Sequence, residues 1–383
     1  KIGKTTLIKQ FGKSNFTFTL KNKDHFQSIK ADTEGFFSRC YKTVFLEEIQ
    51  QLPQTVKSFI KVSQKNPFPC GSFLLSSNFS PLLLGYSKEK IPNHMVCVEM
   101  GGFQLAETWK RPCSKLCDYI TLGQPEKFHA LKCLYTQQEL LLSCLTGSYP
   151  EPALNRLDRS FCHRWHTKRL HTYINQEIGS FYPQLKLPFF TQTMYKLAQL
   201  SASTLPVESL TQKVPKISNN TLKRHVKILE GTRMWRHLST YPAALQRKDN
   251  ETFGLVQDSG LLCHMLKIAS LEELENHPCF PAIWRSFVWE ELLKGFLDRR
   301  IPIKAYSSVT HSSESLLFLE GPFGLIPIGL QTDWGLRGRQ HALHTLNTEV
   351  SRHKNCPYGI LFSLGNRIRQ VSEKLFEIPA GCL

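Results

Sequence analysis

The first residues of the chain place a lysine and two threonines behind a glycine, as a phosphate-binding turn does. Gly3-Lys4-Thr5-Thr6 matches the closing half of a phosphate-binding loop, in which backbone N–H groups surround the phosphates of a nucleotide. In such a loop the lysine reaches the β- and γ-phosphates, and the hydroxyl of the next residue binds Mg²⁺. We therefore expect Gly3, Lys4, Thr5 and Thr6 to contact ATP, with Thr5 also a ligand of Mg²⁺. The glycine that opens the full pattern would precede Lys1, so we expect these 383 residues by themselves to bind ATP feebly.

A pair of acids follows at the distance that such a site requires. Thr6–Phe11 reads as an amphipathic helix, and residues 43–50 form an apolar strand-like run that ends in Glu47 and Glu48. Acids at the carboxyl end of a buried parallel strand hold Mg²⁺ and position water in nucleotide hydrolases. We expect Glu47 to bind Mg²⁺ and Glu48 to orient the attacking water. The alternative is a surface Glu-Glu pair at the start of a helix.

Further strand-like and helix-like segments continue this pattern. Residues 52–60 predict a helix, and Gly71–Asn78 predicts a second buried strand that ends in small polar residues. Ser77 and Asn78 are then the candidates for sensing the γ-phosphate. Residues 96–100 predict one more strand. Strands alternating with helices predict an α/β fold with a parallel sheet and helices on both of its faces.

The charge of the chain is strongly positive, with 48 Lys and Arg against 31 Asp and Glu, for a formal net charge of +17. Such a surplus favours an anionic partner such as nucleic acid, or simply a solvated basic surface. No apolar run approaches the length of about 18 residues that spans a bilayer, so we expect no membrane association. The twelve cysteines are scattered as in reduced cytoplasmic proteins. Cys113 with Cys117, and Cys162-His163 with His166, lack the paired spacing of a zinc site.

Residues from about 190 to 250 predict a winged-helix module. Residues 194–198 and 207–210 read as two helices, and Asn219–Glu230 as a third, with Ser218 or Asn219 as its N-cap. Residues 231–235 would continue into a hairpin. One face of the third helix is apolar, and the other presents Lys223, Arg224 and Lys227. These three residues are candidates for binding DNA in the major groove, or their charges are merely solvated.

In the order of these motifs the chain resembles predicted bacterial and archaeal ATPases of the AAA type, which carry a C-terminal domain of restriction-endonuclease-like fold. The resemblance is carried by residues 3–7, 45–53, 71–78, 103–107, 147–150, 256–261 and 376–379. It implies a P-loop ATPase core over residues 1–150, a helical and winged-helix module over 151–250, and a nuclease-like α/β domain over 251–383. It also implies weak or absent ATP hydrolysis, because Glu47 replaces an aspartate and His94 replaces an arginine of the family.

The nuclease-like domain has lost the residues that such nucleases use to hold a metal ion. The resemblance places its helix at residues 281–294 and two strands at 315–319 and 324–330. At the metal-binding and catalytic positions stand Arg285, Leu316, Gly329 and Gln331. A shift of register would bring in Glu314 or Glu320 without restoring the set, so we expect no nuclease activity. The alternative to an ATP-binding protein is a non-catalytic scaffold that binds DNA or protein; the oligomeric state stays open.

Overall fold

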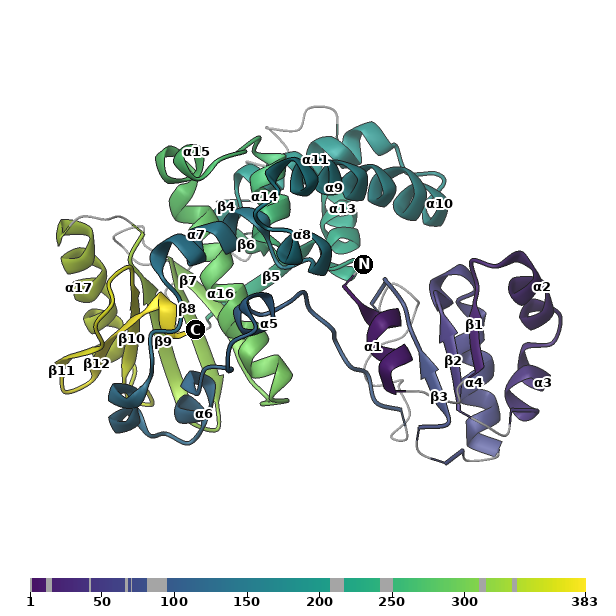
Figure 1. Ribbon diagram of the computed structural model, residues 1–383, viewed down its shortest axis with the longest axis horizontal. Helices are drawn as coiled ribbons and strands as arrows, with labels where there is room; N and C mark the ends of the chain where they lie inside the picture. Colours follow the sequence, from purple (N-terminus) through teal and green to yellow (C-terminus); the bar gives the residue numbers. More distant parts are fainter. Residues whose placement is uncertain are drawn as a thin grey trace. The chain divides into compact units, whose positions relative to one another are not determined.

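The chain has a mixed α/β fold, seen in a computed structural model (Figure 1). The structure describes residues 2–11, 16–40, 43–65, 68–69, 71–80, 95–206, 217–241, 251–309, 315–332 and 336–383. These residues form two compact units. The first consists of residues 1–100 with 227–233, and the second of residues 101–226 with 234–383.

The first unit is built on a parallel sheet of three strands in the order β1-β2-β3. The strands are β1 (Phe16–Thr19), β2 (Val44–Glu47) and β3 (Phe73–Leu75). The helices are α1 (Lys4–Phe11), α2 (Lys23–Ala31), α3 (Thr33–Ser38), the short 3₁₀ turn η1 (Ile49–Gln51) and α4 (Gln54–Lys65). The parallel pairing of β2 with β3 confirms the strands expected around residues 44–47 and 73–75. The helices expected over residues 6–11 and 52–60 are confirmed as α1 and α4.

The core of the first unit lies between this sheet and the helices α2, α3 and α4. The β2 residues Val44, Phe45 and Leu46 are almost fully buried, as expected of a central strand in a parallel sheet. The rings of Phe37 on α3 and Phe59 on α4 meet edge to face at 5.2 Å. Apolar packing therefore fixes the position of β2, whose carboxyl end carries the two predicted acids.

The second unit contains most of the helices. They are α5 (Leu105–Trp109), α6 (Leu116–Thr121), η3 (Pro125–Ala130), α7 (Gln137–Thr146), α8 (Pro150–Leu154), α9 (Arg159–His171), η4 (Thr172–Ile178), α10 (Gly179–Phe181), α11 (Leu187–Gln199), α13 (Asn219–Gly231, the end of which belongs to the first unit), α14 (Ser259–Met265), α15 (Leu271–Asn276), α16 (Phe280–Asp298), α17 (Leu336–Arg352) and η5 (Ala380–Cys382). The segment η4 has π-helical hydrogen bonding and continues α9 without a break.

A mixed sheet of nine strands crosses the second unit in the order β11-β12-β10-β9-β8-β7-β5-β6-β4. Its strands are β4 (Ser203–Pro206), β5 (Trp235–Thr240), β6 (Glu251–Val256), β7 (Lys304–Val309), β8 (Ser315–Gly321), β9 (Gly324–Leu330), β10 (Gly359–Ser363), β11 (Arg369–Ser372) and β12 (Leu375–Pro379). A short parallel pairing between β5 and β7 joins the group of β4, β5 and β6 to the strands β7–β12 in this one sheet.

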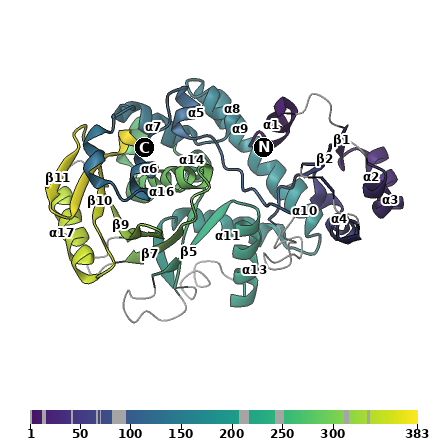
Figure 2. The same ribbon diagram turned by 90° about the horizontal axis from the view of Figure 1, so that it is seen from below.

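Two long helices cover the sheet around β8, β9 and β10. Helix α17 packs on β9 and β10, and α16 lies on the opposite side of these strands in both views (Figures 1 and 2). Helix α16 is buried nearly all round, which is why its sequence shows little amphipathic pattern. The alternating side chains of β8 serve both faces, with Leu316 and Phe318 in the core under α17.

Several further expectations from the sequence have a clear outcome. The helix over 281–294 and the strands over 315–319 and 324–330 are confirmed as α16, β8 and β9. The helix over 219–230 is confirmed as α13, and β5 and β6 behind it pair antiparallel, as a hairpin requires. The strand predicted over 96–100 is wrong. Val96 and Val98 are 81% and 70% exposed, and residues 95–100 have no partner strand, so the alternating valines had no sheet to join.

Candidate functional site

The predicted nucleotide-binding residues meet at one edge of the three-stranded sheet. Lys4 and Thr5 are the first residues of α1, and Glu47 is the last residue of β2. Asn78 follows the end of β3 by a short turn. Because β2 and β3 are parallel, their carboxyl ends lie at the same edge, and this is where ligands bind in open α/β sheets.

Two side-chain contacts fasten the first turn of α1 to these strand ends. Lys4 Nζ donates a hydrogen bond to Asn78 Oδ1 at 2.7 Å. The hydroxyl of Thr5 donates to the Glu47 carboxylate. The structure therefore brings a cation, a hydroxyl, a carboxylate and an amide together from three segments that are far apart in the sequence.

Glu48 lies beside this group but is held by three other side chains. Its backbone is left-handed, with φ of 61°, where the chain leaves β2 and enters η1. The carboxylate accepts hydrogen bonds from Gln50 Nε2 at 2.5 Å and Asn78 Nδ2 at 3.2 Å. It also forms an ion pair with Lys21 Nζ at 3.0 Å. Both oxygens therefore have donors already, and this opposes a role in taking a proton from water.

The other predicted residues of this site have simpler positions. Gly3 has φ of +88°, which glycine adopts without strain, and its carbonyl accepts the N–H of Leu7 at 2.9 Å. Thr6 is exposed on α1 and contributes to no side-chain contact that ties the site together. The hydroxyl of Ser77 accepts the N–H of Phe79 at 2.9 Å, which closes a turn. His94 lies outside the described residues.

Two members of the site were not predicted from the sequence. Lys21 follows β1, where no motif marked it, and it forms the ion pair with Glu48. Gln50 is 5% exposed and also receives the backbone N–H of Asn78 at 3.4 Å. Its place two residues after Glu48 was the one available signal. These two side chains connect the end of β2 to the turn after β3.

The basic residues of α13 point away from its buried face. Leu222 and Leu229 are 1% and 2% exposed, whereas the basic group of Lys223, Arg224 and Lys227 lies on the exposed side of the helix. Ser218 accepts the N–H of Thr221 at 3.2 Å and so serves as the expected N-cap. Residues 207–210, expected as a helix before it, lie outside the described residues.

The residues that the resemblance placed at nuclease positions take part in the packing of the second unit. Leu316 is 1% exposed, and a side chain at Gly329 would contact Leu316, Leu346 and Leu361 at 3.3–3.7 Å. Arg285 donates to the carbonyl of Ala202 at 2.7 Å. Apolar contacts of this kind leave no room for a hydrated ion.

The two acids that a shift of register would bring in offer no alternative. Glu320 accepts a hydrogen bond from Tyr306 at 3.0 Å, and Glu314 lies outside the described residues. Among the residues that the structure describes, no group of three or more His, Cys, Asp or Glu side chains is arranged to hold a metal ion.

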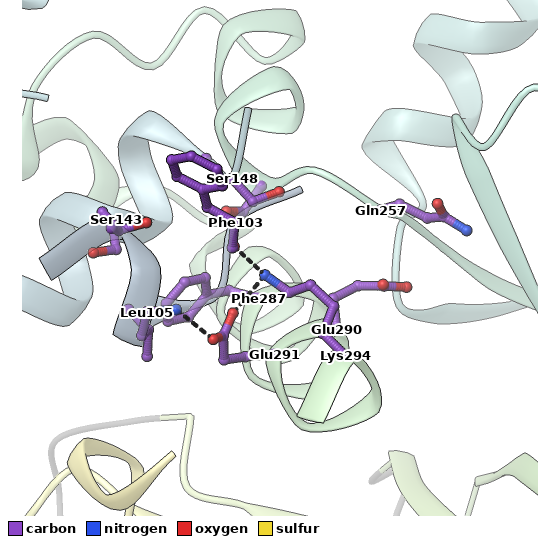
Figure 3. Close-up of a pocket in the computed structure, with 12 residues that line it drawn as sticks. Phe103, Leu105, Ser143, Ser148, Gln257, Phe287, Glu290, Glu291 and Lys294 are labelled. Carbon is purple, nitrogen blue, oxygen red and sulfur yellow. Dashed lines mark hydrogen bonds and ion pairs between the residues drawn. The ribbon is translucent and has the colours of Figure 1, made fainter. Parts of the chain in front are cut away.

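A small polar cavity in the second unit holds a separate group of charges (Figure 3). Lys294 on α16 lies 2.6 Å from the Glu291 carboxylate and donates to the carbonyl of Phe103 at 2.7 Å. Glu291 also accepts the N–H of Leu105 at 2.6 Å. The cavity measures about 20 Å³, room for a water molecule and not for a cofactor. The group ties residues 103–105 to α16.

Comparison with known proteins adds one finding. A model of a family described as a domain of unknown function, DUF8612, matches residues 137–272, about a third of the chain. No curated protein and no solved structure matches the chain significantly. Among the helices in the described part of the chain, none has the length and apolar character needed to cross a bilayer.

Proposed function

We propose that the first unit binds ATP with Mg²⁺ at the edge of its parallel sheet and hydrolyses it slowly or not at all. The observation that carries this proposal is the meeting of Lys4 and Thr5 with Glu47 and Asn78. A small parallel sheet does not require a lysine, a hydroxyl, a carboxylate and an amide at one edge in order to be stable. The same set is what a nucleoside triphosphate with its metal ion uses.

The chemistry of each of these side chains suits one role in binding Mg²⁺-ATP. Lys4 supplies positive charge for the β- and γ-phosphates, and the N-terminus of α1 adds the favourable end of a helix dipole. Thr5 and Glu47 are hard oxygen donors of the type that Mg²⁺ prefers, and their oxygens already face each other. Mg²⁺ bound there would neutralise phosphate charge. The amide of Asn78, beside Lys4, would contact the γ-phosphate.

The state of Glu48 supports slow hydrolysis. A carboxylate that orients water needs a free oxygen directed at the site, and the Glu48 oxygens are engaged by Lys21, Gln50 and Asn78. The longer side chain of Glu47, compared with the aspartate of the resembled family, also changes how a metal ion would be held. We therefore propose nucleotide-dependent binding as the purpose of the site.

A titration of the protein with Mg²⁺-ATP tests this proposal. Lys4→Ala should weaken binding about 10- to 100-fold, the equivalent of one charge-assisted hydrogen bond of about 1.5–3 kcal/mol. Lys9→Ala, an exposed lysine in the last turn of the same helix, is the matched control and should leave the affinity unchanged. Equal affinities of wild type and Lys4→Ala would refute the site. Rapid phosphate release that is lost in Glu48→Gln would refute the slow hydrolysis.

The exposed basic face of α13 favours a second candidate function. A scaffold that binds DNA through Lys223, Arg224 and Lys227 needs no nucleotide and uses a surface on which the three side chains are solvent-accessible. A winged-helix role for this segment and a nuclease-like ancestry for the last part of the chain remain proposals of the same kind. Measurements on DNA separate this function from ATP binding, because the two use different residues.

A further inference from the structure

Two cysteines that are far apart in the sequence meet in the second unit. Cys133 lies in the segment between η3 and α7, and Cys382 ends η5. The backbone N–H groups of Leu134 and Tyr135 both donate to the carbonyl of Gly381, at 2.7 and 3.2 Å. These two bonds hold the segment after Cys133 against the residue before Cys382.

The packing around Gly381 brings the sulfur of Cys133 against the same turn. A Cβ atom placed on Gly381 would lie 2.5 Å from Cys133 Sγ and 2.4 Å from the carbonyl oxygen of Tyr135. Only glycine permits so close an approach. On the other side, the hydroxyl of Ser114 donates to the carbonyl of Cys382. The turn is therefore fixed on two sides, and Cys133 Sγ, which donates to the carbonyl of Tyr135 at 3.7 Å, lies against the residue that precedes Cys382.

The two thiols differ in exposure and in acidity. Cys133 is exposed, whereas Cys382 is fully buried. The hydrogen bond from Cys382 lowers the pKa of the Cys133 thiol to about 7. Donating that bond, together with burial, raises the pKa of Cys382. Near neutral pH the pair therefore contains an accessible thiolate beside a protected thiol, which is the arrangement found in redox-sensitive cysteines.

We propose that Cys133 and Cys382 form a reversible disulfide, in which Cys133 reacts first with a peroxide and Cys382 resolves the product. The Cys133 thiolate attacks one oxygen of hydrogen peroxide, the O–O bond breaks, and hydroxide leaves. Cys133 becomes a sulfenic acid as the peroxide is reduced by two electrons. The sulfur of Cys382 then attacks Cys133, the S–OH bond breaks, and the departing hydroxide takes the Cys382 proton to form water. A dithiol reductant reverses the change by thiol–disulfide exchange.

A second pair of cysteines in the same unit provides an internal control. Cys144 on α7 and Cys263 on α14 are also in contact, with Cys263 Sγ donating to the Cys144 carbonyl at 3.8 Å. Both are fully buried, and burial raises the pKa of Cys144. This pair lacks access to peroxide because both side chains are buried, so it should stay reduced where Cys133 and Cys382 react.

Peptide mapping of the oxidised full chain tests the proposal. The protein is treated with a small excess of hydrogen peroxide, blocked with an alkylating reagent and digested with trypsin and a Glu-specific protease. Cleavage after Lys132 and Glu139 isolates Cys133 from Cys144, and cleavage within residues 374–377 isolates Cys382. We expect a linked Cys133–Cys382 peptide that disappears on treatment with dithiothreitol, and no link between Cys144 and Cys263.

Single-residue variants test whether Cys382 resolves the oxidised Cys133 or is only a neighbouring thiol that does not react. In Cys382→Ala, Cys133 should accumulate as a sulfenic acid that a dimedone probe traps. In Cys133→Ser, Cys382 should remain unmodified because it is buried. Cys113→Ser removes another exposed cysteine and should leave the linked peptide unchanged. A wild-type protein whose Cys133 oxidises without linking to Cys382, or links to Cys113 instead, would overturn the proposal. So would a Cys133 that does not oxidise.

Discussion

The buried ion pair between Glu291 and Lys294 should contribute strongly to the stability of the second unit. Their side chains are 6% and 10% exposed and lie 2.6 Å apart on the same face of α16. Lys294→Met keeps the apolar stem and leaves the Glu291 charge buried without its cation. The carbonyl of Phe103 also loses the donor that Lys294 supplies. Removing one partner of a buried pair costs about 3–5 kcal/mol. We expect a value near 3 kcal/mol, because Glu291 keeps the N–H of Leu105.

Urea unfolding followed by tryptophan fluorescence measures this effect in the second unit alone. All tryptophans of the chain belong to that unit, at positions 109, 165, 235, 284, 289 and 334. The matched control is Lys168→Met, which removes an exposed lysine from α9 and should change the free energy of unfolding by less than about 0.5 kcal/mol.

A double variant separates the charge from the packing. Glu291→Leu with Lys294→Met removes both charges together, so it should recover much of the loss. Leu105 then has an N–H without its acceptor, so a residual cost of about 1–2 kcal/mol remains, less than the loss expected for Lys294→Met alone. A Lys294→Met protein within 1 kcal/mol of wild type would refute this reasoning. A double variant whose loss of stability equals the sum of the losses in Glu291→Leu and Lys294→Met would refute it too, because the two substitutions would then act independently.

Two further predictions concern charge. If the basic face of α13 binds duplex DNA, replacing Lys223, Arg224 and Lys227 together by alanine should flatten the plot of log affinity against log salt by up to about three units; an unchanged slope would leave the face structural. Burial, with His166 and His163 nearby, lowers the pKa of His264 from 6.5 to about 4. The neutral imidazole is therefore favoured by folding, and its contribution to stability is complete above pH 6.5 and is lost as the pH falls from there toward 4. His264→Gln should show a smaller fall in urea midpoint over this range, and an identical fall would contradict the prediction.

The elements that the sequence predicted well are those with strong local signals. Val44–Leu46 is a continuous apolar run with acids behind it, and it forms the central strand of the first sheet. Helix α16 was located through the resemblance, because the hydrophobic side chains that surround it leave no amphipathic pattern. The strand expected at 96–100 failed because alternation describes one face of a sheet and cannot supply a neighbouring strand.

Long-range pairing was the part of the fold that the sequence concealed. The strand β1 was not expected, since Phe16–Thr19 is short and half-exposed. The junction of β5 with β7 rests on two residue pairs, Ser239 with Tyr306 and Thr240 with Ser307. Neither pair has a pattern that marks it in advance. The candidate site shows the same limit of prediction. Its motifs identified Lys4, Thr5, Glu47 and Asn78. Lys21 belongs to no motif, and only the folded structure shows that it pairs with Glu48.

The motifs at 147–150 and 256–261 show how a resemblance can be explained by packing. Asp258 accepts the N–H of Ser148 and that of Leu261, each at 2.7 Å, so one carboxylate caps α14 and holds the other motif. Gly147 has φ of +81°, and a side chain there would strike Asp258 at 2.4 Å. Gly260 lies so close to the carbonyl of Thr146 that a Cβ would be 2.1 Å away.

The residue types at this junction are therefore those that the close approach of α7 and α14 demands, and the fold accounts for them without a ligand. The edge of the first sheet differs in kind. Its contacts join side chain to side chain, from Lys4 to Asn78 and from Thr5 to Glu47. A purely structural contact at that edge would be served as well by apolar residues, which bury surface without the cost of desolvating charge. This contrast is the reason to look for nucleotide at the first motif and for stability at the other two.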